Sequence, residues 1–177
     1  MKHKKYIVAE GKTDKFVFFI DYSFDLNVVL KKHSSTEIII LAMPKSHTDI
    51  VIRTYQTHEC PHTKSNLLVR SVIPEGSTVT FEGTIRIEKN AKLSDAYQKN
   101  ETMLLGETSR IHTSPILEIL NNDVKCTHGA TVKPISETEL LYLRSRGIPR
   151  PQARKMIVRG FIDGIIKNNS YDQHKNN

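Results

Sequence analysis

The feature that most restricts the fold is a series of short apolar runs, rich in β-branched and aromatic residues, in the first two thirds of the chain. None reaches the length of a helix, and none repeats its apolar residues with a 3.6-residue period. Asp, Ser, Asn and Pro stand between them, as at strand ends. The pattern therefore predicts a body of short β-strands, of which the first are Phe16–Ile20, Asn27–Leu30, Ile38–Leu41, Ile50–Ile52 and Leu67–Val69.

The spacing of these runs favours a repeating architecture. The centres of the early runs, Phe18, Val29, Ile39 and Val51, recur every ~10–12 residues. Later apolar positions recur every ~16–18 residues, which suits the rungs of a parallel β-helix. A two-sheet sandwich, with a strand every ~8–12 residues, fits almost as well, so both remain open here. The later positions are Val51, Leu68, Ile85, Met103, Ile119 and Ile135.

Composition narrows the class of protein. The 177 residues suit one domain with room for an appendage, and contain no apolar run of ~18 residues that could span a membrane. Acidic and basic residues follow the N-terminal start too soon for a signal peptide. Two cysteines cannot make a disulfide framework, so we expect reduced thiols and a cytoplasmic protein.

The net charge of +7 is compatible with an anionic partner. The basic residues are spread along the chain, and no aromatic residues alternate with them as in a stacking platform for bases. We therefore do not expect nucleic acid to be the partner.

The last third changes to a helical pattern. Ser136–Glu139 is a capping box that should start a short helix, which Gly147 should end in a left-handed conformation. A second helix should follow Pro151, with Ala153, Ile157 and further apolar residues four apart on one face. We predict a β body at 1–135, a helical hairpin at 136–167 and a disordered tail at 168–177.

Cys126 and His128 are the first candidates for chemistry. In a strand they would point to the same side, and a thiolate with an imidazole suits iron, copper or zinc. A complete site needs further ligands, which another chain could supply. The alternative is a buried cysteine that packs as a small hydrophobic residue, with His128 in a hydrogen bond beside Gly129.

A second candidate metal site is His58, Cys60 and His62, although Pro61 interrupts the register and the segment resembles a turn. Motifs for enzymatic chemistry are missing from the sequence: there is no Walker-type phosphate loop, no zincin motif and no nucleophile elbow. The sequence therefore gives no reason to expect an enzyme.

Ordered motifs from residue 58 onward resemble the core of the SufB/SufD family of iron–sulfur cluster assembly proteins. They begin at His58–Ser65, which has the family's His-x-x-Pro-x-Thr-x-Ser pattern, and end at Leu141–Ile148 and Ala153–Arg154, which resemble its C-terminal helices. Between them lie segments similar to the family's central and last rungs, namely 81–87, 91, 95–98, 104–105, 113, 115, 117–119, 123–126 and 128–131. The resemblance covers about 58–162.

Within that family the chain is similar to the SufD type. Cys126–Thr131 spells Cys-x-His-Gly-Ala-Thr, whereas the SufB-type cysteine before the strand at 102–106 is replaced here by Asn100. Two departures stand out: Lys133 occupies a position where small residues are frequent, and the chain has no counterpart of the long N-terminal helical region of relatives.

The resemblance implies a right-handed parallel β-helix with a C-terminal helical subdomain. It implies a scaffold that pairs with a SufB-like chain or itself through β-helix ends and docks the SufC ATPase. Cys126 and His128 would then lie at the pair interface and hold iron or a nascent cluster transiently, with no resident cofactor. The ATPase would contact Tyr142, Arg144, Arg146, Arg150, Arg154 and Arg159. The rival hypothesis is a metal-binding or purely structural β-helix protein without a role in cluster assembly.

Overall fold

The protein was analysed as a computed structural model, which describes residues 1–171 and the side chains of residues 1–164. Ten strands precede two helices. Their bounds are β1 Lys2–Val8, β2 Thr13–Ile20, β3 Phe24–Leu30, β4 Ser35–Ala42, β5 Ile50–His58, β6 Lys64–Ile73, β7 Thr78–Ile87, β8 Asp95–Leu104, β9 Arg110–Ile119, β10 Lys125–Pro134, α1 Glu137–Ser145 and α2 Arg150–Tyr171.

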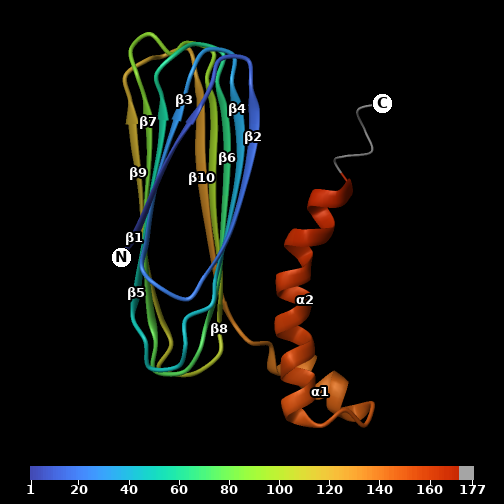
Figure 1. The fold of residues 1–177 in the computed structure, drawn as a ribbon. Coiled ribbons are helices and arrows are strands. Elements are labelled where there is room, and N and C mark those ends of the chain that lie inside the picture. Colours follow the sequence, from blue (N-terminus) through green and yellow to red (C-terminus); the bar gives the residue numbers. More distant parts are fainter. Residues whose placement is uncertain (172–177) are drawn as a thin grey trace. The chain divides into compact units, whose positions relative to one another are not determined.

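The strands form a parallel β-helix of two facing sheets (Figure 1). One sheet has the order β1-β3-β5-β7-β9 and the other β10-β8-β6-β4-β2. The chain therefore alternates between the sheets, and each strand neighbours the strand two places along, as β5 pairs in parallel with β7. The predicted β-helix is confirmed, and the sandwich alternative is excluded.

The apolar positions that recur every ~16–18 residues mark half a coil of the β-helix rather than a whole coil. Val51 and Leu68 lie in β5 and β6, on opposite sheets, so two steps complete a turn. The separation of paired residues grows along the chain, because Lys2 pairs with Phe24, Phe24 with Ile52, and Thr78 with Arg110. The coils thus widen from the N-terminal end of the β-helix to the C-terminal end.

Side-chain alternation decides what each strand buries. In β3 the residues Phe24, Leu26 and Leu30 are fully buried, and the intervening Asp25 and Asn27 face outward. The observed strands are longer than the apolar runs predicted from sequence, because polar residues occupy alternate positions. Lys2–Val8 is also a strand, although its first four residues are all polar and exposed and only Val8 is fully buried.

Outward charges fix the stacking register. Asp25, Arg53 and Glu82 occupy one column of paired positions on three successive coils. Arg53 Nε lies 2.6 Å from Glu82 Oε2. A slip of one residue would turn every inward side chain to the outside and separate this pair, so the column opposes such slips.

Corners between the sheets also stack. Gly11, His33, His62 and Leu93 all have a positive φ, between 56° and 68°. Their amides join coil to coil: His33 N–H donates to the Pro61 carbonyl at 3.2 Å, and His62 N–H donates to the Lys92 carbonyl at 3.0 Å. The ladder of the strands therefore continues around the corner.

The chain divides into two compact units, the β-helix up to Val132 and a second unit from Lys133 onward that contains the helices. Helix α1 begins as predicted, with Ser136 Oγ accepting a hydrogen bond from Glu139 N–H at 3.1 Å. It ends as predicted at Gly147, whose φ is 82° and whose N–H donates to the Arg144 carbonyl. The predicted tail, 168–177, begins within the last turn of α2, and 172–177 lie outside the described residues.

Candidate functional site: the β9 and β10 end of the β-helix

The β-helix ends at β9 and β10, each of which is the last strand of its sheet. In β7 every second residue is buried, but the corresponding residues of β9 are only half-buried or exposed. Leu117 pairs with the fully buried Ile85 and remains half-buried, and Ile119 is 43% exposed beside Ile87. The apolar interior of the β-helix is thus incompletely covered at this end.

Cys126 and His128 lie on β10, where they were predicted to share a face. Cys126 packs against the buried cluster of Ile85, Ile87, Ala91 and Ala96, so its thiol faces the interior. His128 is two residues further along the same strand, which directs its side chain to the same face, and it is exposed. The strand therefore holds a half-buried thiol and an exposed imidazole on the inner face of the last coil.

Burial raises the pKa of the Cys126 thiol above its ordinary value. The cause is desolvation, which disfavours the charged thiolate. A raised pKa makes this cysteine a poor nucleophile and metal ligand by itself at neutral pH. Binding of a cation or metal at this face would have to lower the pKa before the sulfur could act as a ligand.

Beneath this end lies a polar interior that the sequence analysis missed. Gln98 Nε2 donates to the Gly83 carbonyl at 3.2 Å, and Gln98 Oε1 accepts from Gln56 Nε2 at 3.4 Å. Asn100 Nδ2 lies 3.3 Å from Thr113 Oγ1 on β9. Gln98 and Asn100 are almost completely buried. The sequence signal was the row of alternate residues Ala96, Gln98, Asn100 and Thr102, which share one face of β8. Polar residues at alternate positions normally indicate a face that points to solvent, so this row did not suggest a buried layer.

Gly83 is part of this polar layer because it has no side chain. A Cβ placed there would lie 2.3 Å from Gln98 Nε2, so Gln98 occupies the space that a larger residue would fill. The Gln98 amide can therefore reach across the interior from β8 to β7. Glycine in a sequence commonly indicates a turn, but Gly83 lies in the middle of β7.

The second predicted cluster is a corner of the β-helix. The His58 ring is fully buried, with Nδ1 2.7 Å from Thr63 Oγ1 and Nε2 2.8 Å from Ser65 Oγ. Burial lowers the pKa of His58 to about 4, so the ring is neutral at pH 7. Both ring nitrogens already have hydrogen-bond partners, and neither is offered to a metal.

His62 points elsewhere, because its positive φ turns it out of the corner and its exposed ring stacks on His33 with centroids 4.8 Å apart. Cys60 lies between the two histidines and is half-buried. Within the described part of the chain, no group of three or more His, Cys, Asp or Glu side chains is placed to hold a metal ion. The structure thus does not bring His58, Cys60 and His62 together as ligands.

The helical unit carries the third candidate surface. An apolar groove runs between its two helices, and Tyr142, which was predicted to bind a partner, lines it and is 59% exposed. Arg146 stands over the Tyr142 ring, with its guanidinium carbon 5.4 Å from the ring centre. The groove is lined by Thr138, Glu139, Tyr142, Leu143, Met156 and Ile157.

The predicted arginines of the helical unit have differing surroundings. Arg144 and Arg146 are exposed, and Arg154 is half-buried. Arg150 pairs with Glu137 at 3.0 Å, and Arg159 pairs with Asp163 at 3.4 Å. Because those two ion pairs are exposed to solvent, each contributes little to stability. Across residues 1–164, where side chains are described, no helix is long and apolar enough to cross a membrane.

Comparison of the sequence with known proteins identifies the family to which this chain is similar. Residues 22–161 match the family described as SUF system FeS cluster assembly, SufBD core domain. The chain is 35% identical over 169 residues to the iron–sulfur cluster assembly protein SufD of Escherichia coli, covering 90% of this chain and 39% of that protein. It is 33% identical over 129 residues to SufB of Bacillus subtilis, covering 73% of this chain and 27% of that protein.

A SufBD family protein of Mycobacterium bovis is 32% identical over 136 residues, which is 77% of this chain and 16% of the relative. The chain therefore spans less than half the length of each of these relatives. The matched family domain, residues 22–161, includes β3 to β10 and α1.

Proposed function

The chain belongs to the SufBD core family of the SUF iron–sulfur cluster assembly system, and from this premise we propose that it is a SufD-like scaffold subunit rather than an enzyme. In this role it pairs with a SufB-like chain or a second copy of itself in the cytoplasm. The observation that carries the proposal is the incompletely covered β9 and β10 end, with Cys126 and His128 on its inner face.

The SufD type is supported at two positions. Cys126–Thr131 has the Cys-x-His-Gly-Ala-Thr pattern of that type. The position that resembles the SufB-type cysteine is Asn100, a buried residue that donates to Thr113 and has no thiol. A chain with this pattern supplies one cysteine and one histidine to a shared site.

Pairing at this end follows from chemistry as well as from exposure. Unpaired strand edges and the partly exposed Leu117 and Ile119 favour another β-helix end as partner. A cluster needs several thiolate or imidazole ligands, and this chain contributes only two at this face, so the remaining ligands come from the partner. Iron, or a nascent cluster, is the cargo of this interface.

The groove of the helical unit is the proposed docking site for a SufC-type ATPase. It combines an apolar floor with exposed Arg144 and Arg146, which suits an interface with an apolar centre and a charged rim. ATP hydrolysis would be the ATPase's activity, because this chain has no phosphate loop.

Co-purification tests the proposal directly. We expect the tagged chain, co-expressed with the SufB-like and SufC-like proteins of its own organism, to elute with both at a defined native mass. Cys126→Ala and His128→Ala should leave that complex intact and abolish cluster maturation in a target protein. Cys60→Ala is the matched control and should mature clusters normally.

Two results would contradict the proposal. If the chain purifies alone under native expression, the result favours the rival hypothesis, a metal-binding or purely structural β-helix protein without a role in cluster assembly. If the complex forms but both site variants mature clusters at the normal rate, the scaffold role stands and the site assignment is wrong.

A further inference from the structure

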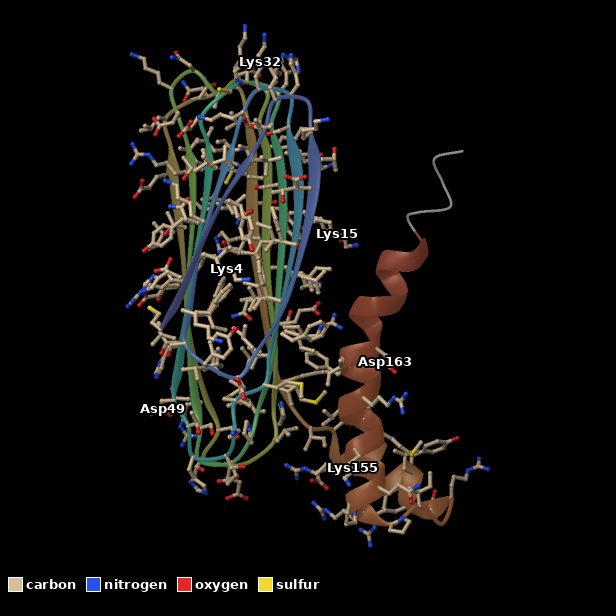
Figure 2. The ribbon with its side chains drawn as sticks, in the orientation of Figure 1. Lys4, Lys15, Lys32, Asp49, Lys155 and Asp163 are labelled. Atoms are coloured by element: carbon tan, nitrogen blue, oxygen red, sulfur yellow. The ribbon has the colours of Figure 1, made fainter. Side chains whose placement is uncertain are left out.

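Two histidines occupy equivalent corners on successive coils of the β-helix. His33 lies in the turn between β3 and β4, and His62 lies in the turn between β5 and β6. Each stands two residues before a strand, and these two strands pair in register, Ser35 with Lys64. Figure 2 labels Lys32, which precedes His33, at this row of corners. The stacking of the coils therefore places one imidazole beside the other.

The backbone directs both side chains the same way. His33 and His62 share a left-handed conformation, with φ of 56° and 58°. Their amides donate to carbonyls of the next coil, those of Pro61 and Lys92 respectively. Both rings are exposed and nearly parallel, with an interplanar angle of 20° and centres 4.8 Å apart. This separation matches the ~4.8 Å spacing of neighbouring strands, so the pair results from the coil repeat.

The ring nitrogens of this pair are available for a ligand. Across residues 1–164, where side chains are described, neither ring has a hydrogen bond or an ion pair. His58 is the contrast, because both of its ring nitrogens have hydrogen-bond partners. An imidazole nitrogen without a partner is a good ligand for zinc, copper and nickel ions. Two such nitrogens on adjacent coils can hold one ion together.

Binding requires only rotation of the two rings. Zinc–nitrogen bonds are about 2.0–2.1 Å long, so two imidazole nitrogens on one ion lie roughly 3 Å apart. Ring centres 4.8 Å apart are close enough for this once each ring turns, and exposed side chains change rotamer rapidly. Within the described part of the chain, no third His, Cys, Asp or Glu joins the pair. Water therefore completes the coordination shell, as it does at open zinc sites.

Nearby charge makes such a site weak. Lys32 precedes His33, Lys92 supplies the carbonyl that accepts from the His62 amide, and both lysines are exposed. Their ammonium groups repel a cation, so a bound ion exchanges readily and binds more tightly when salt screens the repulsion. The pair thus differs from a structural zinc site, which has four protein ligands.

We propose that His33 and His62 form a surface site for a labile divalent transition-metal ion such as Zn²⁺. The site keeps one member of the metal cluster predicted from sequence, His62. It replaces the other members, His58 and Cys60, with a histidine from the preceding coil. Because it lies in the corners between the sheets, it requires neither a partner chain nor the β9 and β10 end.

Zinc titration followed by NMR of the histidine ring protons tests the site residue by residue. We expect the His33 and His62 signals to shift together, with one dissociation constant. His47 is the internal control, because it is also an exposed corner histidine, with φ of 57°, but Gly76 holds the equivalent corner of the next coil. The His47 signal should need at least about tenfold more zinc, because a lone imidazole has no second ligand on the same ion.

Variants then remove one ligand at a time. His33→Gly should weaken zinc binding at His62 at least about tenfold. Glycine fits this corner, as Gly11 does in the preceding coil. His62→Gly should have the same effect at His33, and His47→Gly is the matched control that should leave the shared dissociation constant unchanged.

Circular dichroism checks that each variant is folded, and His33→Asn serves if His33→Gly does not fold, since Asn also tolerates a positive φ. Zinc binding at His33 and His62 that is no tighter than at His47 would overturn the site. So would a His62 affinity that is unchanged in His33→Gly. Neither result bears on the proposed pairing at β9 and β10, because His128 reports on that face through its own signal.

Discussion

The first and last coils of the described β-helix differ in how their interiors are filled. At β1 and β2, rings from both sheets pack together, and Lys2 and Lys4 lie over the Tyr22 and Phe18 rings. At β9 and β10, Leu117 and Ile119 stay partly exposed, and a thiol and an imidazole replace the lysines. The comparison shows that aromatic rings fill the interior at the first coil, whereas the last coil leaves apolar side chains partly exposed beside Cys126.

The largest expected effect compares core residues near the two ends. Phe24→Ala should lower the free energy of unfolding by about 3–5 kcal/mol, since the ring is fully buried and contacts Phe18 and Tyr22. Leu117→Ala should lower it by about 1 kcal/mol or less in the isolated chain, because Leu117 is already partly exposed. Urea unfolding of both variants measures the difference, and equal losses would show that the β9 end is covered after all.

Acid should lower the free energy of unfolding through His58, the last residue of β5, which lies between the two ends of the β-helix. The pKa of His58 is about 4 in the folded chain and 6.5 when unfolded, so below pH 6.5 the unfolded chain binds more protons. Stability is therefore full above pH 6.5 and falls as pH drops towards 4, by about 3 kcal/mol in total. Urea unfolding at several pH values measures this.

His58→Gln removes the titrating group and should flatten that part of the profile, although it is less stable at pH 7. The unaltered chain, unfolded in the same series of buffers, is the control for this profile. A profile that His58→Gln leaves as steep as before would assign the acid sensitivity to other groups.

The polar layer below the β9 end should tolerate little change. Gly83→Ala should lower the free energy of unfolding by about 1–2 kcal/mol, because the new methyl group meets the Gln98 amide. Gln98→Ala in the same chain should relieve that clash, so the combined loss should be smaller than the sum of the single losses. A double-mutant cycle measures this coupling, and strict additivity would contradict the contact.

The smallest expected effect concerns the thiol of Cys126, at the β9 and β10 end of the β-helix. In a Cys60→Ala background, the rate of alkylation of Cys126 should reach half its maximum at a higher pH than that of an ordinary cysteine, because burial raises the pKa. Addition of the partner chain should slow alkylation further at every pH. A midpoint below the ordinary value would instead reveal a nearby cation at this face.

Several features were predictable from local sequence. The helix start at Ser136, whose hydroxyl accepts from Glu139 N–H, and the left-handed Gly147 were predictable because both depend on contacts within a few residues. The shared face of Cys126 and His128 followed from strand alternation alone. His58 was harder: its neutral, buried state depends on Thr63 and Ser65 across a corner, so a sequence pattern typical of metal ligands marked a structural hydrogen-bond network.

The sequence by itself determined the strands, their regular step, the helical hairpin and the family, because these are written in alternation, caps and ordered motifs. Only the tertiary structure decided which alternating row turns inward, so that Gln98 and Asn100 are buried while Asp25 is not. It also left the interior of the β-helix incompletely covered at β9 and β10, where Cys126 packs against the buried cluster of Ile85 and Ile87. The physical reason is that stacking pairs residues that lie a whole coil apart in the sequence, as it pairs Thr78 with Arg110. A pattern that spans only a few residues does not specify such long-range pairs.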